Sequence, residues 1–352
     1  MRPSDISPAD IARVLGISEG YAWHMASKIA EYFNPPRRSM VKGKQRLLDV
    51  PLCLTKKRFK RLQKFLQERL RPHPVAHGGV TRRSPFTSAR QHLGKRIVLT
   101  RDIQDCFPSI NADRMFKALR RFGFQADSAK MLTGLFIVRD RLPQGSPLSS
   151  EAVNLYMRST DNLLSRSFGR RGIRYTRLVD DLVTSFDRDD LIPLVSRILN
   201  RVTREAGLTI SERKRRRAGL QKRHSRQLVH GLVVNDRRGI GIRPDQAREA
   251  RELAESYVFG ARRVTAQTLQ AVAAKREIVA GWMYQVRQAE FSQAVHIQRL
   301  LTTGDRLVRQ WLARIGICPA NGKWWLVVYG RHRRVLRDIP RTLSDRWARL
   351  AA

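Results

Sequence analysis

The sequence has little of what marks secreted, membrane-inserted or zinc-binding proteins. Its 352 residues include only three cysteines, Cys53, Cys106 and Cys318, which lie far apart and form no CxxC pair. Neither a disulfide framework nor a zinc site is therefore predicted. The chain has no apolar run near the roughly 18 to 20 residues that cross a bilayer, and its first residues lack the basic-then-apolar pattern of a signal peptide. We therefore expect a protein of a reducing cytoplasm that does not enter a membrane.

Acidic residues are scarce relative to basic ones. The chain has 30 Asp and Glu against 69 Lys and Arg, which gives a formal net charge of +39. Such an excess repels itself in a compact fold and favours a polyanionic partner, which points to nucleic acid. A generally arginine-rich proteome is the alternative explanation for part of the excess. The hydrophobic content of 42% and the ordinary numbers of glycine and proline predict a folded chain, long enough for several domains or subdomains.

The apolar periodicity predicts a mixed α+β middle and a mostly helical C-terminal third. Two short helices are expected first, over residues 8–15 and 18–32. Their spacing also resembles a DNA-binding helix-turn-helix, although helices that merely cover a larger domain share this spacing. The other predicted elements are strands at 46–52, 97–102, within 175–186 and at 228–234, and helices at 55–70, 112–122, 127–136, 149–167, 190–206 and over much of 244–315.

Two apolar segments carry aspartates where apolar residues should continue. Asp102 ends the first segment, and Asp180 and Asp181 interrupt the second. A carboxylate at the end of a buried strand is costly unless it is paired or bound to a cation. Carboxylates without His or Cys favour Mg²⁺ or Mn²⁺, and such sets are typical of two-metal phosphoryl transfer. Taken alone, the Asp180-Asp181 pair is equally compatible with a two-residue hairpin turn.

Four segments in order along the chain resemble reverse transcriptases, and among them the bacterial retron type. IVLTRDIQDCFPSI resembles the first palm motif, and RLPQGSPLSSEAVNLYM resembles the PQG motif that leads into a palm helix. YTRLVDDLVTSF is similar to the strand-turn-strand that usually contains YADD, and GLTISERK is similar to the next motif, with Lys214 as its basic residue. Their order and spacing make the combined match specific where each motif alone would be weak.

The resemblance implies an α+β right-hand polymerase fold with fingers, palm and a mostly helical thumb. N-terminal helices and fingers would occupy residues 1–96, and the palm with a fingers insertion residues 97–236. The helical thumb would follow at 237–318, and a basic, aromatic tail at 319–352. In this tail Trp324 and Trp325 are compatible with stacking on unpaired bases and equally with packing on the thumb.

The resemblance also assigns roles to individual residues. Asp102 and Asp180 would hold two Mg²⁺ ions, with Asp181 as a third ligand or as a support behind the metal. Phe107 would pack under the sugar and exclude a ribonucleotide 2′-hydroxyl, and Gln144 would border the incoming nucleotide. Basic residues near the N-terminus could bind the triphosphate, with Arg46 the best placed and Lys42 and Lys44 behind it. For the two lysines, a solvated charged surface is the alternative.

Three shorter motif matches narrow the resemblance to the retron type of reverse transcriptase. RSPFTSARQH is similar to the NAxxH signature, with Ser88 where Asn is usual and with His92 matching. LVHGLVVND is similar to the VTG segment, with His230 in place of Thr, and AGWMYQVRQ is similar to a thumb element. From these matches we expect His92 and His230 to contact RNA, although the 88–92 segment could instead fix a loop. The basic residues that are expected to contact RNA phosphates are Lys214, Arg215, Arg216 and Arg217.

The resemblance predicts an RNA-directed DNA polymerase of the bacterial cytoplasm. Its template and primer would be a structured noncoding RNA, its substrates deoxynucleoside triphosphates and its product an RNA–DNA hybrid. An accessory effector protein and a role in anti-phage defence would accompany a retron enzyme. The alternatives are another prokaryotic defence or group II intron-like reverse transcriptase, or a non-catalytic nucleic-acid-binding scaffold with the same fold. Leu178-Val179 in place of Tyr-Ala favours the scaffold, whereas the three aspartates with Phe107 and Gln144 argue against it.

Overall fold

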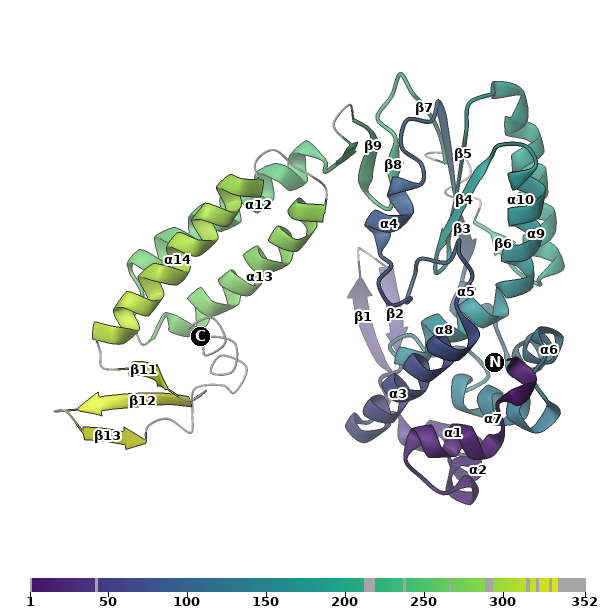
Figure 1. The fold of residues 1–352 in the computed structure, drawn as a ribbon, viewed down its shortest axis with the longest axis horizontal. Helices are drawn as coiled ribbons and strands as arrows, with labels where there is room; N and C mark the ends of the chain where they lie inside the picture. Colours follow the sequence, from purple (N-terminus) through teal and green to yellow (C-terminus); the bar gives the residue numbers. More distant parts are fainter. Residues whose placement is uncertain are drawn as a thin grey trace. The chain divides into compact units, whose positions relative to one another are not determined.

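The chain divides into two units in a computed structural model, Met1–Asn235 and Asp236–Ala352, which Figure 1 shows as ribbons. The residues that the structure describes are 2–41, 44–211, 219–236, 239–265, 267–288, 294–314, 317–320, 323–328 and 331–334. Among the helices in these ranges, none combines the length and the apolar character that a membrane crossing requires.

The first unit begins with a short 3-10 helix, η1 (Pro3–Asp5), and two α-helices, α1 (Pro8–Leu15) and α2 (Glu19–Ser27), followed by η2 (Ile29–Tyr32). Ser7 caps α1 by accepting a hydrogen bond from the amide of Asp10, and Gly16 ends it in a left-handed conformation. The apolar faces of these helices are buried against α3 (Cys53–Leu70) and α7 (Ala126–Phe136). The two helices therefore cover a larger core, as the alternative to a helix-turn-helix predicts.

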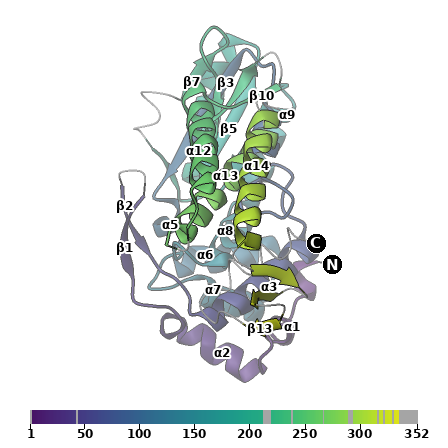
Figure 2. The same ribbon diagram turned by 90° about the vertical axis from the view of Figure 1, so that its left-hand side faces the viewer.

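A two-stranded antiparallel hairpin precedes α3. Its strands are β1 (Arg37–Val41) and β2 (Lys44–Leu48), and Ser39 pairs with Arg46. The hairpin is visible at the left of Figure 2. In α3, Phe59, Leu62 and Leu66 recur at helical spacing and are fully buried, and the helix packs against α8 (Pro147–Tyr156).

An antiparallel sheet forms the centre of the first unit. Its strand order is β4 (Arg174–Leu178), β5 (Asp181–Phe186), β3 (Ile97–Gln104) and β6 (Thr209–Ile210), and β7 (Leu220–Lys222) also pairs with β3. In the β3–β5 register Asp102 lies opposite Asp181, and in the β4–β5 register Leu178 lies opposite Asp181. The pairing therefore brings aspartates from two distant segments of the chain to one point of the sheet.

Further helices complete the first unit. They are α4 (Pro85–Arg90), α5 (Cys106–Ser109), α6 (Ala112–Phe122), α7, α8, α9 (Arg158–Gly169) and α10 (Ile192–Glu205), with η3 (Asp189–Leu191) before α10. Helices α9 and α10 lie side by side next to the sheet (Figure 1). The single long helix expected at 149–167 is wrong, because the chain breaks between α8 and α9 at the buried Met157. The two halves have different partners: α8 packs on α3 and α6, and α9 packs on α10 and β4.

The short strands β8 (Leu228–Val229) and β9 (Leu232–Asp236) pair antiparallel around a turn at His230 and Gly231. β10 (Gly239–Gly241) follows, and the second unit then continues with α12 (Pro244–Arg262), α13 (Leu269–Gln288) and α14 (Ala294–Arg314). Figures 1 and 2 both show α12 and α14 side by side. The strands of a small antiparallel sheet come last: β11 (Ile317–Ala320), β12 (Lys323–Val328) and β13 (Arg331–Arg334).

A buried polar cluster joins the three helices of the second unit. Asp305 accepts hydrogen bonds from the Tyr257 hydroxyl at 2.7 Å and from Arg276 Nε at 2.9 Å. Gly304 lets α14 approach α12, since a Cβ at this position would lie 2.2 Å from the Tyr257 ring. The cluster satisfies the polar groups that the helices bury between them.

Candidate active site

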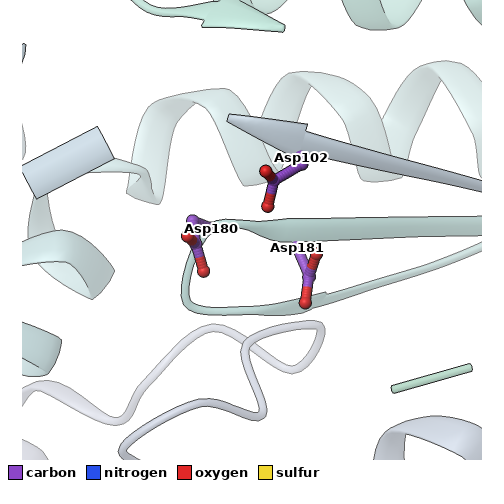
Figure 3. Close-up of side chains that lie close together, drawn as sticks. All are labelled: Asp102, Asp180 and Asp181. Atoms are coloured by element: carbon purple, nitrogen blue, oxygen red, sulfur yellow. The ribbon is translucent and has the colours of Figure 1, made fainter. Parts of the chain in front are cut away.

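Three aspartates come together at the end of the central sheet. Asp102 lies on β3, Asp180 in the turn between β4 and β5, and Asp181 at the start of β5 (Figure 3). Each offers a carboxylate oxygen, and these atoms all lie within 4.8 Å of one another at half-buried positions. The amide of Ile103 donates a hydrogen bond to the Asp180 carbonyl at 3.0 Å, which fixes the turn to β3. The strand register therefore delivers a preformed carboxylate cluster.

This cluster fits a hard divalent cation. All the donor atoms are carboxylate oxygens, which Mg²⁺ and Mn²⁺ prefer over the softer ligands of zinc. Among the described residues no other group of three His, Cys, Asp or Glu side chains meets the same distance criterion. A bound cation would also offset the mutual repulsion of three carboxylates at this separation.

A strained turn carries Asp180. Val179 has a φ of 59°, a left-handed conformation that is rare for a β-branched residue and costs on the order of 1–3 kcal/mol. Arg177 stabilises the turn from behind, because its Nη1 donates to the Val179 carbonyl at 2.9 Å. Arg177 is itself fully buried and pairs with Asp161 at 2.7 Å, while its Nη2 also donates to Asn154. The buried ion pair thus supports the conformation of the turn that carries Asp180.

The segment His77-Gly78-Gly79 packs against this turn and against α8. The His77 amide donates to the Arg177 carbonyl at 2.7 Å, and Asn154 Nδ2 donates to the Gly78 carbonyl at 3.0 Å. A Cβ on Gly79 would lie 2.3 Å from Ser150 Oγ, so only glycine allows this approach. Sequence analysis missed Gly78, Arg177 and Asp161; the only signals available were a Gly-Gly pair and a charged residue inside a buried strand.

Phe107 and Gln144, to which the resemblance assigns contacts with the nucleotide, line one cavity. The cavity has a volume of about 400 Å³, and its other lining residues include Gly145, Ser146 and Ser150. Among the described residues, none gives the buried Gln144 Oε1 a hydrogen-bond partner. The backbone of Gln144 is fixed by the Asp49 amide, which donates to its carbonyl at 2.8 Å. The structure therefore brings these two predicted residues together.

Several predicted contact residues lie outside what the structure describes. Arg46 has a place in β2, but its side chain and that of Lys44 are outside the described part, as is all of Lys42. The predicted phosphate contacts Lys214, Arg215, Arg216 and Arg217 fall in residues 212–218, which the structure does not describe. Their roles in binding the triphosphate and RNA stay predictions.

His92 lies in the interior, where it cannot touch RNA directly. Its side chain is fully buried, with Nδ1 2.8 Å from Ser185 Oγ and Nε2 2.7 Å from Thr176 Oγ1. Burial lowers the pKa of His92 to about 3, so the ring is neutral at physiological pH. Thr176 lies on β4 and Ser185 on β5, so His92 joins the two strands that flank the turn carrying Asp180. This burial corrects the expectation that His92 contacts RNA directly. It agrees with the alternative expectation that the 88–92 segment fixes a loop.

His230 also points away from solvent. Its side chain is only 4% exposed; Nε2 lies 3.0 Å from Ser88 Oγ, and Nδ1 lies 3.8 Å from Asp181 Oδ2. It occupies a left-handed position, with a φ of 51°, in the turn between β8 and β9. The expected RNA contact is thus replaced by a contact with the aspartate cluster.

The chain belongs to the reverse transcriptase (RNA-dependent DNA polymerase) family, whose sequence profile matches residues 42–228, more than half of the chain. It is 32% identical to the retron Mx65 reverse transcriptase of Myxococcus xanthus over 66% of this chain and 58% of that protein. It is 28% identical to the retron Ec86 reverse transcriptase of Escherichia coli over 52% of this chain and 56% of that protein. These matches confirm the predicted polymerase fold and the retron-type resemblance.

The chain spans about half the length of the curated relatives it matches. Among solved structures, apo telomerase from Candida tropicalis aligns at 10% identity and a TM-score of 0.45, covering 85% of this chain and 63% of that chain.

Proposed function

We propose that the chain is an RNA-directed DNA polymerase that extends a primer hydroxyl with deoxynucleoside triphosphates. The observation that carries this proposal is the cluster of Asp102, Asp180 and Asp181, whose carboxylate oxygens lie within 4.8 Å of one another. Membership of the reverse transcriptase family supports the choice of RNA as template. The cavity lined by Phe107 and Gln144 supports a nucleotide as the second substrate.

In the proposed reaction the three aspartates would hold two Mg²⁺ ions. These ions would lower the pKa of the attacking hydroxyl and neutralise charge on the leaving pyrophosphate. Phe107 presents its ring to the sugar and leaves no room for a 2′-hydroxyl, which selects deoxynucleotides by steric rejection. Gln144 borders the same cavity and helps to orient the incoming nucleotide.

The proposal extends to the biological setting of a retron. The template and primer would be a structured noncoding RNA, and the product would be an RNA–DNA molecule. The protein would act in the bacterial cytoplasm together with an accessory effector protein. Its role would be anti-phage defence. The similarity to the retron Mx65 and Ec86 enzymes supports it.

The test is primer extension by the purified chain on matched RNA and DNA templates. We expect deoxynucleotide incorporation on the RNA template in Mg²⁺, and none when EDTA removes the metal. Nucleic acid that copurifies would be sequenced to identify the template. Tight RNA binding without incorporation under any metal condition would contradict the proposal and favour the non-catalytic scaffold.

A further inference from the structure

The two positions at which the chain departs from the retron signatures touch each other. Ser88 stands where Asn is usual and His230 where Thr is usual, and 142 positions separate them in the sequence. In the structure Ser88 Oγ lies 3.0 Å from His230 Nε2. Ser88 is fully buried, and the His230 side chain is 4% exposed. A smaller residue at one position thus accompanies a larger residue at the other in a shared buried space.

The contact between Ser88 and His230 belongs to a longer row of polar side-chain contacts. Ser88 Oγ lies 2.7 Å from Thr176 Oγ1, which in turn lies 2.7 Å from His92 Nε2. At the other end, His230 Nδ1 lies 3.8 Å from Asp181 Oδ2. This row of polar contacts therefore runs from the β4–β5 strand pair to one of the three clustered aspartates.

Donor and acceptor counting leaves two possible directions for this row of hydrogen bonds, and the Asp181 carboxylate decides between them. Each hydroxyl has a single proton, so Ser88 and Thr176 must donate in the same sense along the row. In one sense the Ser88 hydroxyl donates to His230 Nε2, which leaves the ring N–H on Nδ1, facing Asp181. In the opposite sense a lone pair on Nδ1 would face a carboxylate. The carboxylate favours the first arrangement, which aims an N–H at Asp181.

We propose that His230 is a positioning residue that orients the Asp181 carboxylate for metal binding, with Ser88 as its matched support. The inference rests on the proposed function, because it gives Asp181 a metal to bind. At 3.8 Å the contact is longer than a hydrogen bond, so it acts on Asp181 as a directed electrostatic attraction. A threonine at position 230 is too short to make this contact. It would also be strained at a φ of 51°, a conformation that histidine tolerates better than β-branched residues.

The experiment measures Mn²⁺ binding to the full chain without nucleic acid, by electron paramagnetic resonance of the free ion. His230→Asn is the main variant, because Asn tolerates the left-handed backbone but does not reach Asp181. His224→Asn on the exposed β7–β8 connection is the matched control. We expect His230→Asn to weaken Mn²⁺ binding about tenfold or more while the control binds as wild type does. The KM for deoxynucleotides should change little.

A swap tests whether positions 88 and 230 are matched. Ser88→Asn alone overfills the buried site, and His230→Thr alone leaves a cavity, so each should weaken Mn²⁺ binding. The double variant should bind more tightly than the sum of the two single effects predicts. Wild-type Mn²⁺ affinity in His230→Asn, or strictly additive effects in the swap, would overturn the proposal. Failure of the proposed function would appear differently, as wild-type chain that binds Mn²⁺ but does not extend a primer.

Discussion

Gly78 lies directly against Val179. A Cβ on Gly78 would be 2.4 Å from Val179 Cγ2 and 2.5 Å from the Val179 amide nitrogen. Real side chains do not approach so closely, so the residue at position 78 must be glycine for the turn to keep its place. The turn in question carries Asp180 and already holds Val179 in a left-handed conformation. The geometry of the aspartate cluster therefore depends on a residue that contributes no side chain.

Gly78→Ala should consequently impair synthesis far more than it impairs folding. The added methyl group has to displace the Val179 turn, and a shift of about 1 Å in a catalytic group can cost roughly 10²-fold in rate. The measurement is primer extension under single-turnover conditions. Gly20→Ala in α2 is the control, because a Cβ there meets nothing within 4 Å. Equal activity of the two variants would show that the turn is not held by this contact.

The buried pair of Arg177 and Asp161 predicts a large effect on stability. Both side chains are fully buried, so Arg177→Met leaves the Asp161 carboxylate without its charged partner. We expect the free energy of unfolding to fall by about 3–5 kcal/mol, measured by urea denaturation. Replacing both residues, as Arg177→Met with Asp161→Leu, should recover part of the loss. A single variant as stable as wild type would contradict the role of the pair in the fold.

The pH dependence of stability should report the burial of His92. Its folded pKa of about 3 lies below the 6.5 of an unfolded histidine. The folded protein therefore binds fewer protons in this window, so the contribution of neutral His92 is complete above pH 6.5 and is lost as the pH falls toward 3. The slope from this residue should reach about 1.4 kcal/mol per pH unit.

The comparison for His92 is a set of urea denaturation curves between pH 7.5 and 4.5. The stability advantage of wild type over His92→Gln should shrink as the pH falls. The exposed His224, replaced in the same way, provides the control. A difference between wild type and His92→Gln that stays constant with pH would place His92 in contact with water.

Much of the site follows from the sequence because local patterns determine it. The apolar runs around Asp102, Asp180 and Asp181 predict the strands that carry them, whereas the meeting of the three aspartates is what the resemblance to reverse transcriptases implies. Helix α6 has the predicted bounds, since Asn111 caps it and Gly123 ends it in a left-handed conformation. Contacts between distant segments could not be predicted in this way. His92 contacts Thr176 and Ser185, which follow it by more than 80 residues. No local sequence pattern predicts this contact.

Phe107 should decide the choice of sugar. It lines the same cavity as Gln144, and a smaller side chain opens space at the sugar 2′ position. Phe107→Val should therefore raise ribonucleotide incorporation relative to deoxynucleotide incorporation, with a smaller change in deoxynucleotide turnover. The measurement is the ratio of kcat/KM values for one deoxynucleotide and its ribonucleotide. An unchanged ratio would assign Phe107 to core packing alone.

The most direct test of the account is the comparison of Asp180→Asn with wild type in two assays on one preparation. Asp180 is expected to ligate Mg²⁺, so its neutral variant should lose several orders of magnitude in primer extension. RNA affinity should stay close to that of wild type, because we expect the phosphate contacts to come from basic residues elsewhere. Loss of synthesis with retained RNA binding is the result that we predict. Robust synthesis by Asp180→Asn would contradict the assignment of the aspartate cluster as the catalytic centre.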